Sequence, residues 1–336
     1  MNGLFRFEGN KMNEYMKFKD KLSRYLQANE KYPRSIFIEV TPLCNLRCAF
    51  CACYIKGEEV TRYRENNYMS YEAFKKIIDN IAGKFNFQMN FTYSGEPLLN
   101  QDVFKMVRYL ADRNIPSKIY SNAMLLKPKQ AKEMLASGLD RFVISFDSAV
   151  KETYEAIRVG GRFEQVVENL RYLIKLRNEL GQSKPFVETQ IIMTNKNAHE
   201  LESFKQLSED IGVDNAYSKS LYIYRNTDNQ EYIEQVEGYF WEGDIARYER
   251  TEKGFVLKDK GGCPELQSCV ITVDGNVVMC CFDLHGKHVF GNAIDRSLVD
   301  IWDSPKYRQF RQEVMAPRQL TLCQQCITSN PVKQDL

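Results

Sequence analysis

The spacing of apolar residues changes repeatedly along the chain, from the alternation typical of a strand to the periodicity typical of a helix. From residue 35 onward the pattern repeats as six strand–helix units. We expect strands at 36–40, 87–93, 118–121, 141–146, 186–193 and 216–224, separated by helices such as 70–81, 102–113, 128–137, 163–180 and 198–210. A complete eightfold barrel needs about 250 residues and two more units. The pattern therefore predicts an α/β fold, a partial (β/α)6 TIM-like barrel.

Chemistry in such a fold belongs in the loops at the carboxyl ends of the strands. Cys44, Glu96 and Ser121 each follow a different predicted strand. Because parallel strands end at the same edge of the sheet, we expect these three side chains to meet on one rim.

The flanks of the barrel differ from it in pattern. Residues 1–34 predict an amphipathic helix that packs on the main domain, and 270–281 predict a β-hairpin around Asp274–Gly275. Residues 225–262 have no clean periodicity and are left unassigned. We expect an N-terminal helical segment at 1–34, a barrel at 35–235, and a hairpin-and-helix, cluster-binding extension at 236–336.

Charge and composition restrict the partners. The chain has 46 basic and 44 acidic residues, a net charge of +2, and a hydrophobic fraction of 43% that supplies a substantial core. We therefore expect no nucleic-acid partner and no membrane partner. The first residues lack the apolar core of a signal peptide, and no run of about 18 apolar residues occurs, so we expect a cytoplasmic protein.

Ten cysteines form two groups, at 44–53 and at 263–326. Cytosolic thiols stay reduced, so this clustering indicates two metal sites instead of disulfides. The first group includes Cys44, Cys48 and Cys51, spaced CxxxCxxC directly after the first strand. Three thiolates on one loop leave a metal position open, which suits a cluster iron that binds a further ligand. Half a zinc site or a thioredoxin-like redox pair would also use Cys48 and Cys51.

The cysteine spacing, Phe50 just before the last cysteine, and the preceding strand resemble the radical S-adenosylmethionine (SAM) enzymes. In that family three such cysteines hold a four-iron four-sulfur cluster, whose free iron takes the amino and carboxylate groups of SAM. The resemblance implies that the reduced cluster cleaves SAM to methionine and a 5′-deoxyadenosyl radical, which abstracts a hydrogen atom from the substrate. It also implies an external reductant of the flavodoxin or ferredoxin type.

Ser94-Gly95-Glu96-Pro97 ends the second strand, where the family has a Gly-Gly-Glu-Pro signature that binds the SAM ammonium group. Ser94 replaces the first glycine, Gly95 still permits close backbone approach, and Glu96 is able to accept a charge-assisted hydrogen bond. An isolated Gly-Glu-Pro is more often a turn with a surface glutamate. Its position relative to the cysteine loop favours ligand binding here.

Further polar residues end the later strands. Ser121 and Asn122 are similar to a family segment that meets the SAM ribose and carboxylate, although a plain capping turn would also use them. Tyr154 and Arg158 resemble a pair that braces the neighbouring loop in relatives. The cofactor-binding residues that the resemblance implies are Phe50, Ser94, Gly95, Glu96, Ser121, Asn122, Ser145, Asp147 and Gln190.

The second cysteine group is similar to the SPASM and shorter twitch extensions, which hold auxiliary iron–sulfur clusters. A full extension with two extra clusters has further cysteines after the CxxC pair, and Cys326 is the last cysteine of this chain. The resemblance therefore implies one auxiliary four-iron cluster. Adjacent cysteines in a strand point to opposite faces, so only one of Cys280 and Cys281 is expected to reach the cluster. We choose Cys281, with Cys280 or Cys269 as substitutes. A structural zinc ribbon is the alternative. The implied ligands are Cys263, Cys281, Cys323 and Cys326.

The segment before the first strand is too short for the leader-binding domain of many peptide-modifying relatives, although that domain can be a separate protein. The resemblance therefore implies a small-molecule substrate, such as a sugar or aminocyclitol, and its oxidation (dehydrogenation) with the auxiliary cluster as electron acceptor. Epimerisation is the second reading, and it would use a thiol as hydrogen donor. The candidate donors are Cys53, Cys269 and Cys280.

Two alternatives remain open. Peptide modification would use the same clusters as the small-molecule reaction. Outside the enzyme class, the chain would be an iron–sulfur electron carrier or a zinc protein. Neither of these needs the Gly-Glu-Pro loop, so cleavage of SAM by the reduced protein separates them from an enzyme.

Overall fold

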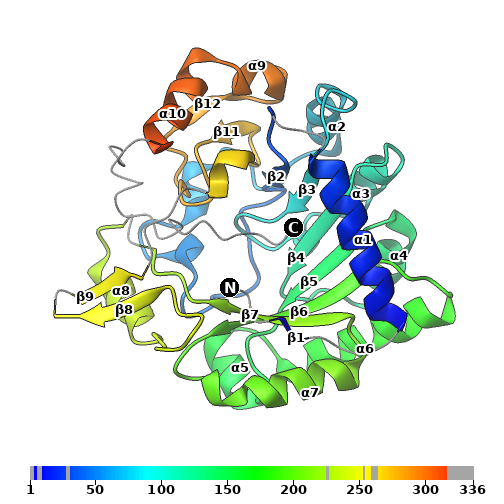
Figure 1. Cartoon of the computed structure of the whole chain (residues 1–336), viewed down its shortest axis with the longest axis vertical. Coiled ribbons are helices and arrows are strands. Elements are labelled where there is room, and N and C mark those ends of the chain that lie inside the picture. Colours follow the sequence, from blue (N-terminus) through cyan, green and yellow to red (C-terminus); the bar gives the residue numbers. More distant parts are fainter. Residues whose placement is uncertain are drawn as a thin grey trace.

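The fold is built on one large sheet, which the computed structural model describes over residues 4–5, 10–27, 31–224, 227–252, 254–258 and 264–315 (Figure 1). Within these ranges, ten strands join in the order β1-β7-β6-β5-β4-β3-β2-β10-β11-β12. The sheet does not close, because β1 and β12 are its two edges. The prediction of an α/β fold with a partial, unclosed barrel is confirmed.

All six predicted strands are present, and they pair in parallel in chain order. They are β2 (Ser35–Ile38), β3 (Gln88–Phe91), β4 (Ser117–Ser121), β5 (Arg141–Ser145), β6 (Phe186–Met193) and β7 (Asn215–Ser220). The short strand β1 (Leu4–Phe5) adds to β7 in the antiparallel direction. Parallel pairing brings the carboxyl ends of six strands to one rim, as the strand–helix pattern predicts.

The C-terminal segment extends the same sheet. Strand β10 (Ser268–Ile271) pairs in parallel with β2, and β11 (Asn276–Val278) and β12 (Val289–Asn292) follow in the antiparallel direction. The predicted hairpin is confirmed, with Val270 opposite Val278. Gly275 forms its turn at φ +83°, a conformation that glycine adopts without strain. Hydrogen bonds of the sheet therefore join the barrel to the extension, while the predicted domain boundaries stay predictions.

Helices cover one face of the sheet, and the main core lies between them and the strands. Ser70 begins the first of these helices, as predicted, because its hydroxyl accepts a hydrogen bond from Ala73 N. These helices are α2 (Tyr71–Asp79), α3 (Val103–Ala111), α4 (Pro128–Ser137), α5 (Lys151–Ile157), α6 (Phe163–Glu179) and α7 (Leu201–Ile211). Short 3-10 turns are η1 (Ala52–Tyr54), η2 (Val60–Tyr63), η3 (Pro97–Leu99), η4 (Ala198–Glu200) and η5 (Pro264–Gln267).

The segment that the sequence left unassigned forms defined structure in its described part. It contains α8 (Gln230–Glu237) and a hairpin of β8 (Tyr248–Thr251) and β9 (Gly254–Leu257). Its buried aromatic residues Tyr232, Phe240 and Tyr248 form a second apolar cluster with Ile55, next to the cysteine loop. The aromatic composition of this segment thus supplies a packing surface for the loop.

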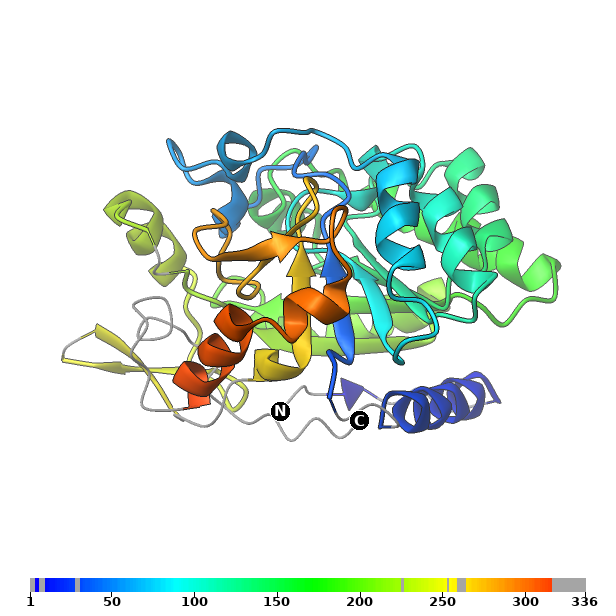
Figure 2. The same ribbon diagram turned by 90° about the horizontal axis from the view of Figure 1, so that it is seen from above.

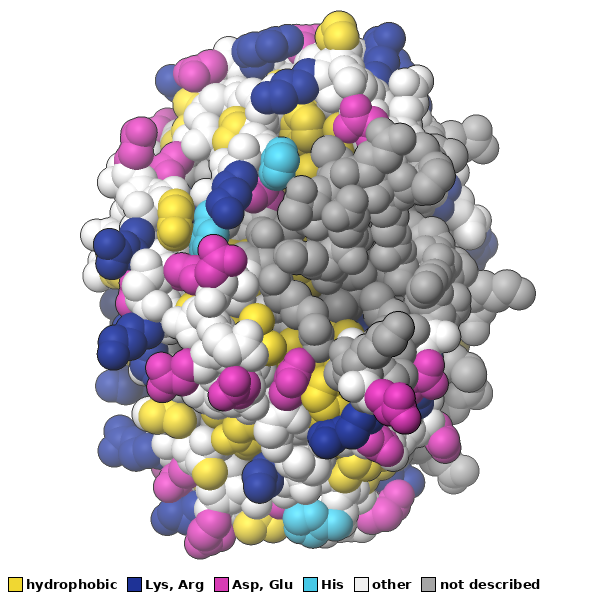
Figure 3. All heavy atoms as spheres, turned by 90° about the vertical axis from the view of Figure 1, so that its left-hand side faces the viewer, with side chains coloured by type: hydrophobic (Ala, Val, Ile, Leu, Met, Phe, Trp, Pro, Cys, Tyr) yellow, Lys and Arg dark blue, Asp and Glu magenta, His cyan; other side chains and the backbone are white. Residues whose placement is uncertain are grey.

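The C-terminal helices α9 (Leu298–Trp302) and α10 (Pro305–Met315) pack beside β12. The rings of Phe290 and Tyr307 stack at 4.1 Å, and Trp302 Nε1 donates to Lys31 O at 3.0 Å. None of the helices in the described ranges is long and apolar enough to cross a bilayer. Figure 3 shows that basic and acidic side chains both occur across the described part of one face, as their near balance in the sequence predicts.

Helix α1 (Asn10–Gln27) lies beside the amino ends of the parallel strands, on the side opposite the cysteine loop (Figure 2). Its contact with the sheet depends on Tyr15, whose hydroxyl donates to Glu188 Oε1 at 2.6 Å. Leu22 and Leu26 are buried beside it, whereas the apolar side chain of Met16 is 41% exposed. The apolar side of the helix is thus narrower than its sequence suggests.

Replacing Tyr15 with phenylalanine is expected to lower the free energy of unfolding by about 1–3 kcal/mol, because the buried Glu188 carboxylate loses a donor. Urea unfolding of the purified protein measures this change. Tyr68→Phe is the matched control, since Tyr68 is 48% exposed. Equal unfolding midpoints for the two variants would contradict the proposed anchoring of α1.

Candidate active site at the carboxyl ends of the strands

The loop after β2 carries Cys44, Cys48 and Cys51, all half-buried and free of disulfides. Nitrogen donors surround two of the sulfurs. Leu46 N lies 3.4 Å from Cys44 Sγ, and Arg158 Nη1 lies 3.5 Å from Cys48 Sγ. Donors of this kind stabilise thiolate ligands and tune the metal that they hold.

The backbone of the cysteine loop is fixed from two sides. Arg47 N and Ala49 N donate to Val159 O and Ile157 O, each at 2.9 Å, so the end of α5 carries the loop. From within the loop, Tyr54 donates through its hydroxyl to Pro42 O at 2.9 Å. The loop is therefore held in shape by its own chain.

The three thiolates of the loop are soft ligands, which iron–sulfur clusters and zinc both accept. In the described part of the chain, no three Cys, His, Asp or Glu side chains converge closely enough to hold one metal ion. A zinc ion would require that convergence, whereas a four-iron cluster takes each thiolate on a different iron. A four-iron cluster accepts the three thiolates of this loop, each on its own iron.

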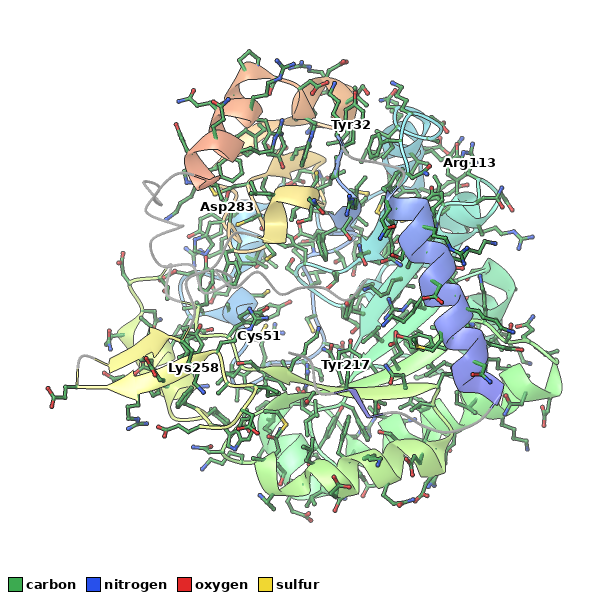
Figure 4. All side chains as sticks on the ribbon, in the orientation of Figure 1. Tyr32, Cys51, Arg113, Tyr217, Lys258 and Asp283 are labelled. Atoms are coloured by element: carbon green, nitrogen blue, oxygen red, sulfur yellow. The ribbon has the colours of Figure 1, made fainter. Side chains whose placement is uncertain are left out.

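The cysteines differ in their pKa values. Burial raises the pKa of the Cys44 thiol to about 12 and also raises that of Cys48. A hydrogen bond from the Cys53 thiol lowers the pKa of Cys51 to about 7. Cys53 therefore lies within hydrogen-bond reach of a predicted cluster ligand (Figure 4 labels Cys51).

Gly95 lies directly against the backbone of the cysteine loop. A Cβ at this position would lie 2.2 Å from Thr41 O and 2.6 Å from Leu43 O, and the residue has φ +69°. The next residue, Glu96, donates its backbone N–H to Leu43 O at 2.7 Å. Only glycine allows this approach, so Gly95 joins the ends of β2 and β3.

The carboxylate of Glu96 joins the ends of β3 and β4. It accepts hydrogen bonds from Leu98 N at 3.1 Å, Ser121 Oγ at 2.7 Å and Asn122 N at 2.8 Å. Burial raises its pKa, since the side chain is only 2% exposed. Asn122 Nδ2 then donates to Asn45 Oδ1 at 3.0 Å and lies 3.9 Å from Cys44 Sγ. The structure thus brings Glu96, Ser121 and Asn122 together beside the cysteine loop.

Comparison with known proteins agrees with this arrangement. A family model described as the radical SAM superfamily matches residues 38–207, half of the chain. The chain belongs to this superfamily. A second model, an iron–sulfur cluster-binding domain named SPASM, matches residues 263–327. Together the two domains imply a radical SAM enzyme with a SAM-binding four-iron cluster and an auxiliary iron–sulfur cluster.

Curated relatives match over most of their length. The tungsten-containing aldehyde ferredoxin oxidoreductase cofactor-modifying protein of Pyrococcus furiosus is 28% identical over 309 residues, which cover 82% of each chain. The mycofactocin maturase MftC of Mycobacterium ulcerans is 25% identical over 308 residues, which cover 86% of this chain and 78% of the maturase.

Solved structures share the fold. Streptococcus suis SuiB bound to the precursor peptide SuiA has a TM-score of 0.61 at 16% identity, over 89% of this chain and 71% of that chain. Native anSMEcpe with bound AdoMet has a TM-score of 0.60 at 16% identity, over 89% and 91% of the two chains. At these identities the likeness shows the fold alone.

Within this radical SAM site, the side chain of Ser94 belongs to a further hydrogen-bond network, while its predicted contact with SAM stays a prediction. Its hydroxyl donates to the buried carboxylate of Glu39, which also pairs with Arg64 at 2.6 Å and accepts from Val273 N at 2.9 Å. This network joins β2, β3 and the C-terminal hairpin. Sequence reasoning missed Glu39 and Arg64, although a glutamate inside the apolar strand 36–40 was a signal.

Asp147, Ser145 and Gln190 lie at neighbouring strand ends. Asp147, at φ +52°, forms an ion pair with Arg158 and accepts from Ile192 N at 2.7 Å. Gln190 Nε2 donates to Ser145 Oγ at 2.9 Å, and Gln190 Oε1 accepts from the Tyr217 hydroxyl at 3.1 Å. Asp147 thus holds Arg158 beside Cys48, whereas Ser145 and Gln190 form a separate hydrogen-bonded chain.

The remaining predicted residues are spread over several places. Phe50 contacts Tyr239 edge to face at 5.9 Å, next to α8. Cys280 and Cys281 are half-buried just beyond β11. Cys269 is only 1% exposed and opposes Ile36 early in β10, so the structure does not bring it to the rim. The predicted ligands Cys263, Cys323 and Cys326 lie outside the described residues.

A cleft of about 390 Å³ opens beside the cysteine loop. Cys48 and Cys51 line it from the loop, Ala156 from α5, and Tyr232 and Gln235 from α8. The cleft gives molecules in solution access to the loop from the side of α8.

Replacing Cys53 with alanine is expected to leave the iron content unchanged, because Cys44, Cys48 and Cys51 remain as ligands. Cys51→Ala is the control, and it should lose about half of the iron if each of two clusters holds four. Iron and sulfide assays on anaerobically reconstituted protein measure both. Equal iron loss in the two variants would make Cys53 a ligand and contradict the assignment.

Proposed function

We propose that this radical SAM enzyme modifies a peptide by abstracting a hydrogen atom from one of its residues. The supporting observation is that similarity to the mycofactocin maturase extends over 308 residues, which cover 86% of this chain. The fold likeness to SuiB bound to its precursor peptide adds to it. The small-molecule substrate expected from the sequence has less support, and its dehydrogenation or epimerisation stays a prediction, as does a cytoplasmic location.

In this proposal, Cys44, Cys48 and Cys51 hold the cluster that, when reduced, supplies the electron for cleavage of SAM. Glu96 has two carboxylate oxygens and three protein donors, so an acceptor position remains for the SAM ammonium group. The Asn122 amide holds the rim against Asn45, which fixes the distance between Glu96 and the cysteines. Arg158 places a positive charge beside Cys48.

The auxiliary site completes the proposal. We assign one cluster to Cys263, Cys281, Cys323 and Cys326, with Cys280 as the substitute for Cys281. Four protein thiolates leave no open iron, so this cluster would accept an electron from the substrate radical. The cleft beside Cys48 and Cys51 offers the external reductant, of the flavodoxin or ferredoxin type, its approach to the first cluster.

The test uses the reconstituted enzyme with SAM, dithionite and short peptides encoded next to its gene. Mass spectrometry should find a peptide with a changed mass, and its formation should match the 5′-deoxyadenosine produced. A variant that lacks Cys44, Cys48 and Cys51 should give neither product. Stimulation of SAM cleavage by sugars or aminocyclitols, with every peptide unchanged, would overturn the proposal in favour of a small molecule.

A further inference from the structure

The face of the sheet opposite the helices carries a group of charged side chains. Strand alternation places them there, because their sequence neighbours Ile119, Phe142, Val187 and Ala216 belong to the core on the helix side. We call the opposite side the inner face. The charged and aromatic residues on it in β4 to β7 are Lys118, Tyr120, Arg141, Glu188, Tyr217 and Lys219.

Lys118 and Lys219 meet at one aromatic ring. Their Nζ atoms lie 4.8 Å and 5.2 Å from the centroid of the Tyr120 ring, and Lys219 Nζ also lies 5.6 Å from that of Tyr217 (Figure 4 labels Tyr217). Strands β4 and β7 are separated by two others, about 14 Å in a flat sheet. The curvature of the sheet therefore brings both ammonium groups to the Tyr120 ring, near enough for Lys118 to act electrostatically on Lys219.

The charges on the inner face do not balance. Arg141 already pairs with Glu188 at 2.6 Å. In the described ranges, neither Lys118 nor Lys219 forms an ion pair or a hydrogen bond, and the two lysines contact the rings of Tyr120 and Tyr217. The charged groups that act on the two lysines are Arg141, Glu188, Lys19 and Arg247. Three inner-face cations thus face one carboxylate.

Two ammonium groups in this arrangement favour the binding of an anion between the strands that carry them. Burial lowers the pKa of both lysines, to about 7 for Lys118, where Arg141 adds to the effect. Burying a charged group without an ion-pair partner costs free energy, and a bound anion offsets that cost. Both side chains remain partly accessible, so a ligand has room to reach them.

We propose that Lys118 and Lys219 bind a carboxylate of the substrate on the inner face of the sheet. This inference rests on the proposed peptide-modifying function, and the carboxylate is an acidic side chain or the peptide's C-terminus. Tyr120 immediately precedes Ser121 and lies two residues, about 7 Å along the strand, below Asn122. The bound carboxylate would therefore fix the reacting carbon several bonds away, toward the cysteine loop.

The test measures the access of a reagent to the two lysines in the reconstituted enzyme with SAM. Isotope-labelled formaldehyde and a mild reductant methylate amines, and mass spectrometry of digests gives the rate at each lysine. Three N-acetylated synthetic peptide sets of one length serve as probes: a glutamine set with amidated C-termini, the matching glutamate set, and the glutamine set with free C-termini. Lys132 is the internal control, since it is exposed.

We expect the glutamate set or the free-C-terminus set to slow labelling of Lys118 and Lys219 about fivefold at four-fifths occupancy, with Lys132 unchanged. The set that protects identifies the source of the carboxylate. Equal labelling with all three sets, or equal protection of Lys132, would overturn the inference. A Lys219→Met variant should lose the charge-dependent protection of Lys118, whereas Lys132→Met should keep it.

Together with the assay of SAM cleavage and peptide mass described for the proposed function, the labelling experiment distinguishes the two proposals. If the wild-type enzyme cleaves SAM and modifies peptides of either charge equally, only the carboxylate inference fails. If acidic peptides protect the lysines but every peptide stays unmodified while sugars or aminocyclitols stimulate SAM cleavage, the peptide-modifying function fails and the anion site stands.

Discussion

Replacing Gly95 with alanine is expected to reduce the rate of SAM cleavage about 100-fold, the usual effect of displacing reacting groups by about 1 Å. The new Cβ would lie 2.2 Å from Thr41 O and 2.6 Å from Leu43 O, and both neighbours are backbone atoms that cannot rotate away. The strand ends would have to separate, which moves Glu96 away from Cys44. Production of 5′-deoxyadenosine by the reconstituted enzyme measures the effect.

Gly57→Ala is the matched control for this variant. Gly57 also has a positive φ, +85°, but its Cβ would meet nothing within 4 Å. Strain from the left-handed conformation is therefore common to both variants, at about 1–2 kcal/mol, while the clash occurs only at Gly95. Activities within threefold of each other in the two variants would show that contact between the two loops is not required.

Replacing Arg158 with methionine is expected to destabilise the protein by about 3–5 kcal/mol, because Asp147 would be left as a buried carboxylate without its ion-pair partner. The same change removes a positive charge and an N–H donor from beside Cys48. The reduction potential of the SAM-binding cluster should then become more negative, since charge and hydrogen bonds at the sulfurs set it. Urea unfolding and an anaerobic redox titration measure the two effects.

Arg177→Met is the matched control for Arg158→Met, because it should lower the free energy of unfolding without changing the surroundings of the cluster. Arg177 forms a buried ion pair with Asp214, and it also donates to Pro185 O at 2.8 Å. Its loss should cost a similar free energy of unfolding and leave the cluster potential unchanged. A similar shift of potential in both variants would mean that Arg158 acts through general destabilisation and not through Cys48.

Local sequence features predicted the parts of the site that depend on neighbours in the chain. The cysteine loop, Gly95 and Glu96 are readable because each follows a strand whose alternation is clear. The partners of Glu39 could not be predicted from the sequence, because Arg64 and Val273 lie in segments far from it along the chain. The same holds for Asp147, whose ion pair with Arg158 depends on how the end of α5 turns back to the loop.

The sheet shows a similar limit. Six parallel strands follow from periodicity, but the pairing of β10 with β2 joins residues more than 200 positions apart, and no local pattern encodes it. The substrate class was the least predictable property. A short N-terminal segment argued for a small molecule, whereas the specificity of the inner face depends on Lys118 and Lys219, which meet only because the sheet curves.

Iron and sulfide content, measured anaerobically together with SAM cleavage, tests the central claim most directly. The wild type should hold about eight irons per chain, and a variant with Cys44, Cys48 and Cys51 all changed to alanine should hold about four and produce no 5′-deoxyadenosine. An unchanged iron content, or continued SAM cleavage by that variant, would contradict the assignment of the loop after β2 as the site of radical generation.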